Sequence, residues 1–173
     1  MDFDTPPLAS ANLEMGVLAG IFADGTREWR DELGEVDEDA IVWQCYPEGY
    51  SVGGLILHII EVEGWWIHEV IAGKKFMLPE LELASGEIDQ DNFKWPAPPR
   101  RPLSWYYEAQ DRVRQETLDI LRNITDPDAE RKVRSGHTMS VRWIVQHVFH
   151  HEAYHGGQAV MASVLYRFRN QSL

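Results

Sequence analysis

The chain has 173 residues, of which 44% are hydrophobic and 11% aromatic, and its formal net charge is −12 at pH 7. This apolar content can fill a core, which excludes a disordered chain, and the length fits a single domain over residues 1–173. The acidic surface would repel a phosphate backbone, so we expect no nucleic-acid partner.

The cysteine count and the absence of long apolar runs indicate a cytoplasmic protein. Cys45 is the only cysteine, so no intramolecular disulfide can form, as is usual in a reducing compartment. The first residues lack the basic and apolar regions of a signal peptide. No run approaches the roughly 18 apolar residues that a membrane span needs, so we expect no membrane partner.

Two helices are predicted in the first half of the chain. The first covers about residues 9–35, and Gly25 would allow a break within it. Its apolar residues recur at mostly helical spacing: Leu13, Val17, Ile21, Trp29 and Leu33. The second covers about residues 52–72, with Ser51 as its N-cap and Gly73 at its end.

A proline-rich segment separates the second helix from two more. Residues 76–103 contain five prolines, which predict an extended crossover along the surface. A third helix is predicted from Ser104 to about residue 124, and a fourth, capped by Ser140, over about residues 141–168. No segment has the pattern of a β-hairpin. The sequence therefore predicts an all-α four-helix bundle with a long crossover between helices 2 and 3.

Four of the seven histidines lie at residues 147–155 of the fourth predicted helix. His147, His151 and His155 fall within about 80° of one another on a helical wheel, on the apolar face. The opposite arc carries Arg142, Gln146, Glu152 and Ala153. Imidazoles spaced by four residues can share one metal ion, whereas buried imidazoles without partners cost a few kcal/mol. Metal ligation and hydrogen-bonded core histidines are both consistent with this pattern.

The second predicted helix offers a further ligand. His58 lies on the apolar stripe of Leu55, Val62 and Trp65, so it also faces the core, where a histidine can be a ligand or purely structural. Helix bundles commonly build metal sites from facing helices. Of the other histidines, we expect His68 and His137 to lie at the surface. His147 can be a fourth ligand, a partner of a ligand or simply a buried residue.

Two motifs resemble those of the DinB/YfiT-like metalloproteins. Residues 51–58 (SVGGLILH), followed by EGWW at 63–66, resemble the second helix of that family, and HEAYHGGQ at 151–158 resembles its last helix. The resemblance implies a four-helix bundle, a homodimer, and one divalent ion on His58, His151 and His155. Zinc and nickel are the first candidates for this ion. That family often has an arginine directly after its last ligand, where this chain has Gly156.

Three imidazoles would leave a coordination position open, as in catalytic zinc sites, for a small-molecule substrate. One hypothesis is a hydrolase in which Glu61 or Glu69 acts as the base. Another, implied by relatives of that family, is a thiol S-transferase in which Cys45 is dispensable. A third is a non-catalytic binding or stress-response protein that the ion holds together. An anionic thiol would need nearby cations, for which the candidates are Arg100, Arg101 and Arg142.

Two groups of apolar residues have alternative explanations. The tryptophans near the proposed site can line an apolar pocket or fill the core: Trp65, Trp66, Trp95 and Trp105. Ile56, Ile60 and Ile67 lie opposite the His58 stripe, so the second helix is apolar on two sides. A partner in a homodimer or the 76–103 crossover could cover that second side.

Overall fold

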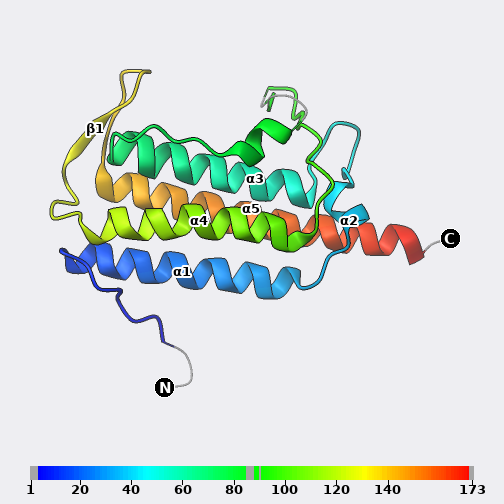
Figure 1. The fold of residues 1–173 in the computed structure, drawn as a ribbon, viewed down its shortest axis with the longest axis horizontal. Helices are drawn as coiled ribbons and strands as arrows, with labels where there is room; N and C mark the ends of the chain where they lie inside the picture. The colour runs from blue at the N-terminus through cyan, green and yellow to red at the C-terminus, as the bar shows by residue number, and fades with distance from the viewer. Residues whose placement is uncertain (1–3, 85–87, 90, 172–173) are drawn as a thin grey trace.

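The computed structural model describes residues 4–84, 88–89 and 91–171 and is mostly helical, as expected (Figure 1). Its elements in chain order are α1 (Leu13–Leu33), α2 (Glu38–Val42), α3 (Val52–Glu63), the π-helix η1 (Gly64–Ile71), the 3-10 helix η2 (Pro79–Leu83), α4 (Leu103–Arg122), β1 (Glu130–Lys132), β2 (Thr138–Ser140) and α5 (Val141–Gln171).

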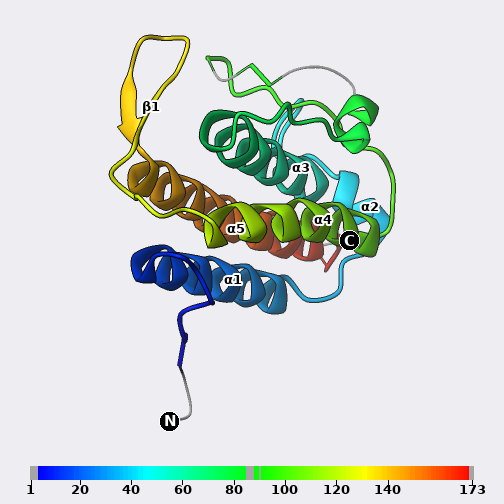
Figure 2. The same cartoon turned by 60° about the vertical axis from the view of Figure 1, so that its left-hand side comes forward.

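The long helices lie side by side (Figures 1 and 2). Helices α1 and α3 each pack against both α4 and α5, so these four helices surround a common interior. Helix α5 is the longest, at 31 residues, and its C-terminal end extends past α1 and α3 in Figure 1. None of the described helices combines the length and apolar content needed to cross a membrane.

The predicted helix starts are mostly correct because their caps are present. The Ser51 hydroxyl accepts a hydrogen bond from the Gly54 N–H at 3.2 Å, and the Ser140 hydroxyl accepts one from the Trp143 N–H at 3.2 Å. Helix α1 runs through Gly25 without a break. The second predicted helix is continuous to Ile71 but changes from α- to π-helical geometry at Gly64.

The expectation that the chain has no hairpin is wrong at residues 130–140. Strands β1 and β2 pair antiparallel, with Glu130 opposite Ser140. The turn between them contains Gly136 at φ +89°, a conformation that suits glycine. Strands of three residues are too short to show the alternation that sequence analysis relies on. The short helix α2 was also absent from the sequence-based prediction.

The predicted buried stripe of α1 is wrong over its first half. Leu13, Val17 and Ile21 have exposed fractions of 75%, 37% and 37%. The buried residues of that half are Met15, Ala19 and Phe22, together with two glycines. Trp29 and Leu33 are buried as expected. The buried face of this half contains glycine and alanine, which are only weakly apolar, so the pattern of large apolar residues did not identify it.

The second apolar side of α3 and η1 is buried within the chain. Ile56, Ile60 and Ile67 are each 0% exposed. Ile56 and Ile60 share an apolar cluster with Tyr106 and Ala109 of α4. The argument that a second subunit covers this side is therefore wrong, because α4 covers it.

Candidate metal centre

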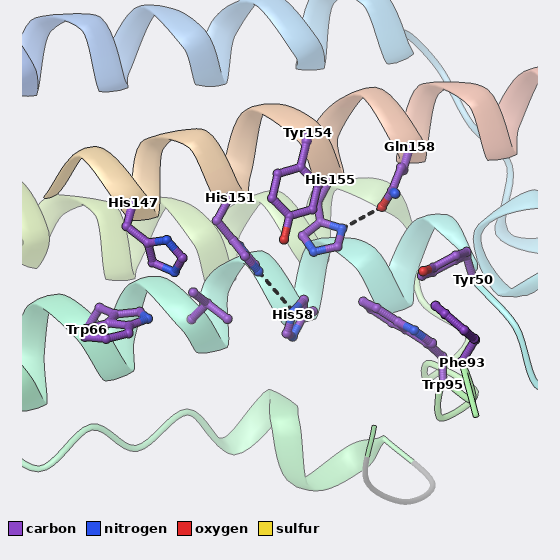
Figure 3. Close-up of a pocket in the computed structure, with 11 residues that line it drawn as sticks. Tyr50, His58, Trp66, Phe93, Trp95, His147, His151, Tyr154, His155 and Gln158 are labelled. Atoms are coloured by element: carbon purple, nitrogen blue, oxygen red, sulfur yellow. Dashed lines mark hydrogen bonds between the residues drawn. The ribbon is translucent and has the colours of Figure 1, made fainter. Parts of the chain in front are cut away.

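His58, His151 and His155 converge between α3 and α5 (Figure 3). Nε2 of His58 lies 3.1 Å from Nε2 of His151, and one ring nitrogen from each histidine falls within 4.8 Å of the others. Two nitrogens bound to one tetrahedral zinc ion lie roughly 3.3 Å apart. The three side chains expose only 9%, 6% and 5% of their surface. The geometry therefore fits one shared ion.

The protonation of these rings also suits a metal ion. Burial, with a smaller contribution from the neighbouring histidines, lowers the pKa of His151 to about 3. Burial likewise lowers the pKa of His155 to about 4. Nδ1–H of His155 donates to Oε1 of Gln158 at 2.6 Å, which leaves Nε2 as its free lone pair. Neutral imidazoles with free lone pairs are the form that binds zinc, nickel and similar ions.

His58 is held differently. Its Nδ1 is buried and has no hydrogen-bond partner, and Oε2 of Glu61 lies 3.5 Å away. A carboxylate beside the outer nitrogen of a ligating imidazole helps to fix its tautomer and orientation. Glu61 is therefore placed behind His58 rather than in front of its Nε2.

The histidines open into a cavity of about 530 Å³ (Figure 3). It is lined by Tyr50, His58, Val62, Trp66, Phe93, Trp95, His147, His151, Tyr154, His155 and Gln158. Trp66 and His147 lie at one end, Tyr50, Phe93 and Trp95 lie at the other, and the three clustered histidines lie between them. No aspartate, glutamate, lysine or arginine is among these lining residues.

His147 lies outside the three-nitrogen cluster. Its ring stacks on Trp143, with 4.8 Å between centroids, and meets the edge of Trp66 at 5.4 Å. Its centroid is 6.3 Å from that of His151. Burial lowers its pKa, so the ring is neutral and forms part of an aromatic wall. Trp65 and Trp105, in contrast, do not line this cavity.

The carboxylates and cations considered from sequence lie elsewhere. Glu61 and Glu69 line a neighbouring cavity, and Oε1 of Glu69 accepts a hydrogen bond from the Phe76 N–H at 3.0 Å. Arg100 pairs with Asp39 at 2.5 Å, and Arg142 pairs with Glu14 and Asp128. Arg101 is exposed and does not line the cavity. The pocket therefore has neither a basic mouth nor a facing carboxylate among its described lining residues.

One predicted surface position, His68, is buried, and so is Glu152. His68 is 4% exposed, and its Nε2 lies 3.2 Å from Oγ1 of Thr117, which joins η1 to α4. Glu152, on the arc opposite the histidines, is 2% exposed, whereas Gln146 and Ala153 on that arc are exposed. Helix α5 contacts α1 as well as α3, and Glu152 bonds to Thr26 of α1. His137 is exposed, as expected.

Glu152 belongs to a buried polar network in the common interior of the helices. Nη2 of Arg114 lies 2.6 Å from Oε2 of Glu152 and 2.9 Å from Oε2 of Glu63, while its Nε lies 2.9 Å from Oε1 of Glu63. Oε1 of Glu152 also accepts hydrogen bonds from Thr26 at 2.8 Å, Gln110 at 2.9 Å and Trp29 at 3.0 Å. The network ties all four long helices to the residue next to His151.

The glycine that replaces the expected arginine lies inside this packing. A Cβ atom on Gly156 would come within 2.6 Å of the Trp29 ring of α1. The position faces the interior between α1 and α5, not the cavity. An arginine side chain has no space there, so this chain cannot use that residue to bind a substrate anion.

We expect Gly156→Ala to lower the free energy of unfolding by about 1–3 kcal/mol, because Trp29 must move away from Glu152. Gly157→Ala is the matched control. Its Cβ would meet nothing within 4 Å, so better helix propensity should stabilise that variant by up to about 1 kcal/mol. Urea denaturation of both variants measures the difference, and equal effects would contradict this packing argument.

A comparison of the sequence with known protein families supports a metal site at these histidines. Residues 17–162 match the family model described as mycothiol-S-transferase. No curated protein matches the chain. The matched family is DinB/YfiT-like, which confirms the resemblance seen in the two helical motifs. Because the match covers most of the chain, including all three clustered histidines, the chain belongs to the mycothiol-S-transferase family.

Proposed function

We propose that this protein is a metal-dependent thiol S-transferase that joins mycothiol to a small-molecule electrophile. The observation that carries the proposal is the set of three clustered imidazoles opening into an aromatic cavity. A divalent ion, for which zinc and nickel are the first candidates, would lower the pKa of a bound thiol. It would thereby supply the thiolate nucleophile. The thiolate sulfur then bonds to the electrophilic carbon, whose leaving group departs with its electron pair.

The carboxylates favour transfer over hydrolysis. A hydrolase needs a base near the attacking water, and both candidates, Glu61 and Glu69, line the neighbouring cavity. A thiol S-transferase needs no such base, because the thiolate is already the nucleophile. The family match points to the same chemistry.

The apolar clusters favour a catalytic ion over one that holds the fold together. Two clusters of buried apolar residues join the helices through side chains that need no ion. We therefore propose a four-helix bundle that stays folded without its ion. The homodimer is a further proposal that rests on the family resemblance, and its interface must lie away from Ile56, Ile60 and Ile67.

The test uses protein purified without an affinity tag and loaded with zinc or nickel. We expect saturable formation of the S-conjugate from mycothiol and 1-chloro-2,4-dinitrobenzene, followed by mass spectrometry. A chelator should stop turnover and leave the circular dichroism spectrum unchanged, and added metal should restore turnover. Metal-loaded protein that forms no conjugate above the uncatalysed rate would refute the proposal.

Cys45 provides a separate prediction. Burial raises the pKa of its thiol, and the residue does not line the cavity, so it is a poor nucleophile for this reaction. We expect Cys45→Ser to keep turnover within about twofold of the wild type, since no bond to the reactants is lost. A complete loss of conjugate formation with retained metal content would assign the nucleophile to the protein.

A further inference from the structure

The two ends of the cavity differ in chemistry (Figure 3). The end at Tyr50 and Trp95 is aromatic but also carries a phenol and, on α5, the amide of Gln158. The end at Val62 and Trp66 is closed by His147 and has no hydroxyl or amide side chain among its described lining residues. The clustered histidines lie between the two ends, so reactants bound at each end would meet at the metal centre.

Helical spacing explains the apolar end. His58, Val62 and Trp66 follow at intervals of four residues along α3 and η1, so they share one face. Across the cavity, His147 lies one turn before His151 on α5. The Trp66 and His147 rings are 5.4 Å apart, and Trp143 stacks on His147 from behind. The result is an aromatic wall, with the Trp66 ring nearly perpendicular to the His147 ring, that continues from the metal ligands.

A constrained turn builds the polar aromatic end. Phe93 has φ +54°, a left-handed conformation that non-glycine residues adopt uncommonly, and its side chain is 63% exposed. Paired backbone hydrogen bonds of 2.9 Å between Asp89 and Lys94 close the turn. The Tyr46 hydroxyl donates to the Phe93 carbonyl at 2.8 Å. These bonds hold an exposed aromatic ring at the cavity rim, beside Trp95 (Figure 3).

We infer that the Tyr50–Phe93–Trp95 end binds the hydroxyl-rich body of the thiol, and that the Val62–Trp66–His147 end binds an uncharged, planar electrophile. This inference rests on the proposed function. A sugar-like body presents C–H faces for stacking on aromatic rings and hydroxyls for hydrogen bonds, both of which the first end offers. The second end offers apolar and aromatic contact and the ring nitrogens of Trp66 and His147, but no Asp, Glu, Lys or Arg side chain to pair with a charged group.

The first experiment measures binding without turnover. Calorimetry of mycothiol with the metal-loaded protein should show that Phe93→Ala weakens binding about tenfold, since one stacked ring is lost. Trp66→Leu should leave this affinity within about twofold. Phe168→Ala is the matched control, because Phe168 is equally exposed, at 63%, and does not line the cavity. Equal weakening by Phe93→Ala and Trp66→Leu would overturn the assignment of the ends.

The second experiment compares electrophiles. The thiolate bonds to the carbon that carries chlorine, and chloride leaves with the bonding electrons while the thiol proton passes to the buffer. We expect kcat/KM, divided by the uncatalysed rate, to be at least about tenfold higher for 1-chloro-2,4-dinitrobenzene than for the anionic 4-chloro-3-nitrobenzoate. Trp66→Leu should raise KM for the neutral electrophile, whereas Trp105→Leu, outside the cavity, should not.

The two proposals fail in different ways. Equal normalised kcat/KM values for the neutral and anionic electrophiles would overturn the inference and leave the proposed function standing. Selective weakening of mycothiol binding by Phe93→Ala, with no turnover of any electrophile, would refute the proposed transferase function. It would still support the assignment of the Tyr50–Phe93–Trp95 end to the thiol. Wild-type protein that does not bind mycothiol would overturn both.

Discussion

Replacing His151 with alanine should remove the bound ion and abolish thiol transfer while the chain stays folded. Its Nε2 lies 3.1 Å from Nε2 of His58, and its ring centroid is 4.4 Å from that of His155, so it is the central member of the cluster. Residues that only hydrogen-bond to a ligand cost 10–100-fold in metal affinity when removed. Loss of a ligand itself should cost more than about 100-fold. Turnover should fall to the uncatalysed rate, because the thiolate would no longer be stabilised.

His150→Ala is the matched control. His150 is the preceding residue on α5, is exposed and does not line the cavity, so its loss should leave metal content and turnover unchanged. Elemental analysis of protein purified without an affinity tag measures metal content per chain, and circular dichroism tests the fold. A His151→Ala protein that keeps a stoichiometric ion would contradict the site. An unfolded variant would show instead that this imidazole is required by the fold.

The histidine cluster could be predicted because its members follow local rules. His151 and His155 are one helical turn apart, and His58 lies on an apolar stripe that begins just after a well-formed cap at Ser51. Helical periodicity therefore identified the apolar faces of α3 and α5 that carry these histidines. The two family motifs added the expectation that the faces meet, which the contacts between α3 and α5 confirm.

Periodicity was less informative where a helix has several neighbours. Glu152 lies on the arc of α5 opposite the histidines, yet it is 2% exposed because its carboxylate bonds to Thr26 of α1 and Arg114 of α4. His68 was assigned to the surface, but it meets Thr117 of α4. A helical wheel shows which residues share an arc, not how many helices surround it. Buried polar partners, which come from distant segments, decide such cases.

Only part of the cavity wall could be predicted from the sequence: two of the tryptophans considered as pocket residues, Trp66 and Trp95, line it. Tyr50 and Phe93 lie on separate loops, and their place beside the histidines depends on how the 76–103 crossover folds back over α3. Tyr154 and Gln158 gave a weak signal, since they flank His155 at one and three residues. That signal could not distinguish Tyr154 and Gln158 from other residues of α5, because both side chains are partly exposed even though they line the cavity.

Replacing Arg114 with methionine should cause the largest loss of stability of any change outside the metal centre. Arg114 is the only cation bonded to Glu63 and Glu152 among the described residues, and these carboxylate side chains are 1% and 3% exposed. Although burial opposes its charge, the two carboxylates raise the pKa of Arg114 above its usual value, so it is a permanent cation. Methionine would leave two negative charges facing each other in the interior.

Removing one partner of a buried ion pair typically costs 3–5 kcal/mol. We expect Arg114→Met to lower the free energy of unfolding by about this amount, measured by urea denaturation of the metal-free protein. Arg27→Met is the control, because Arg27 pairs with Asp24 and Asp31 on an exposed face of α1 and should matter far less. Adding Glu63→Leu to Arg114→Met should recover part of the loss, since one of the two uncompensated charges is then gone. If the double variant is less stable than Arg114→Met alone, the network is held together by shape and packing rather than by its charges.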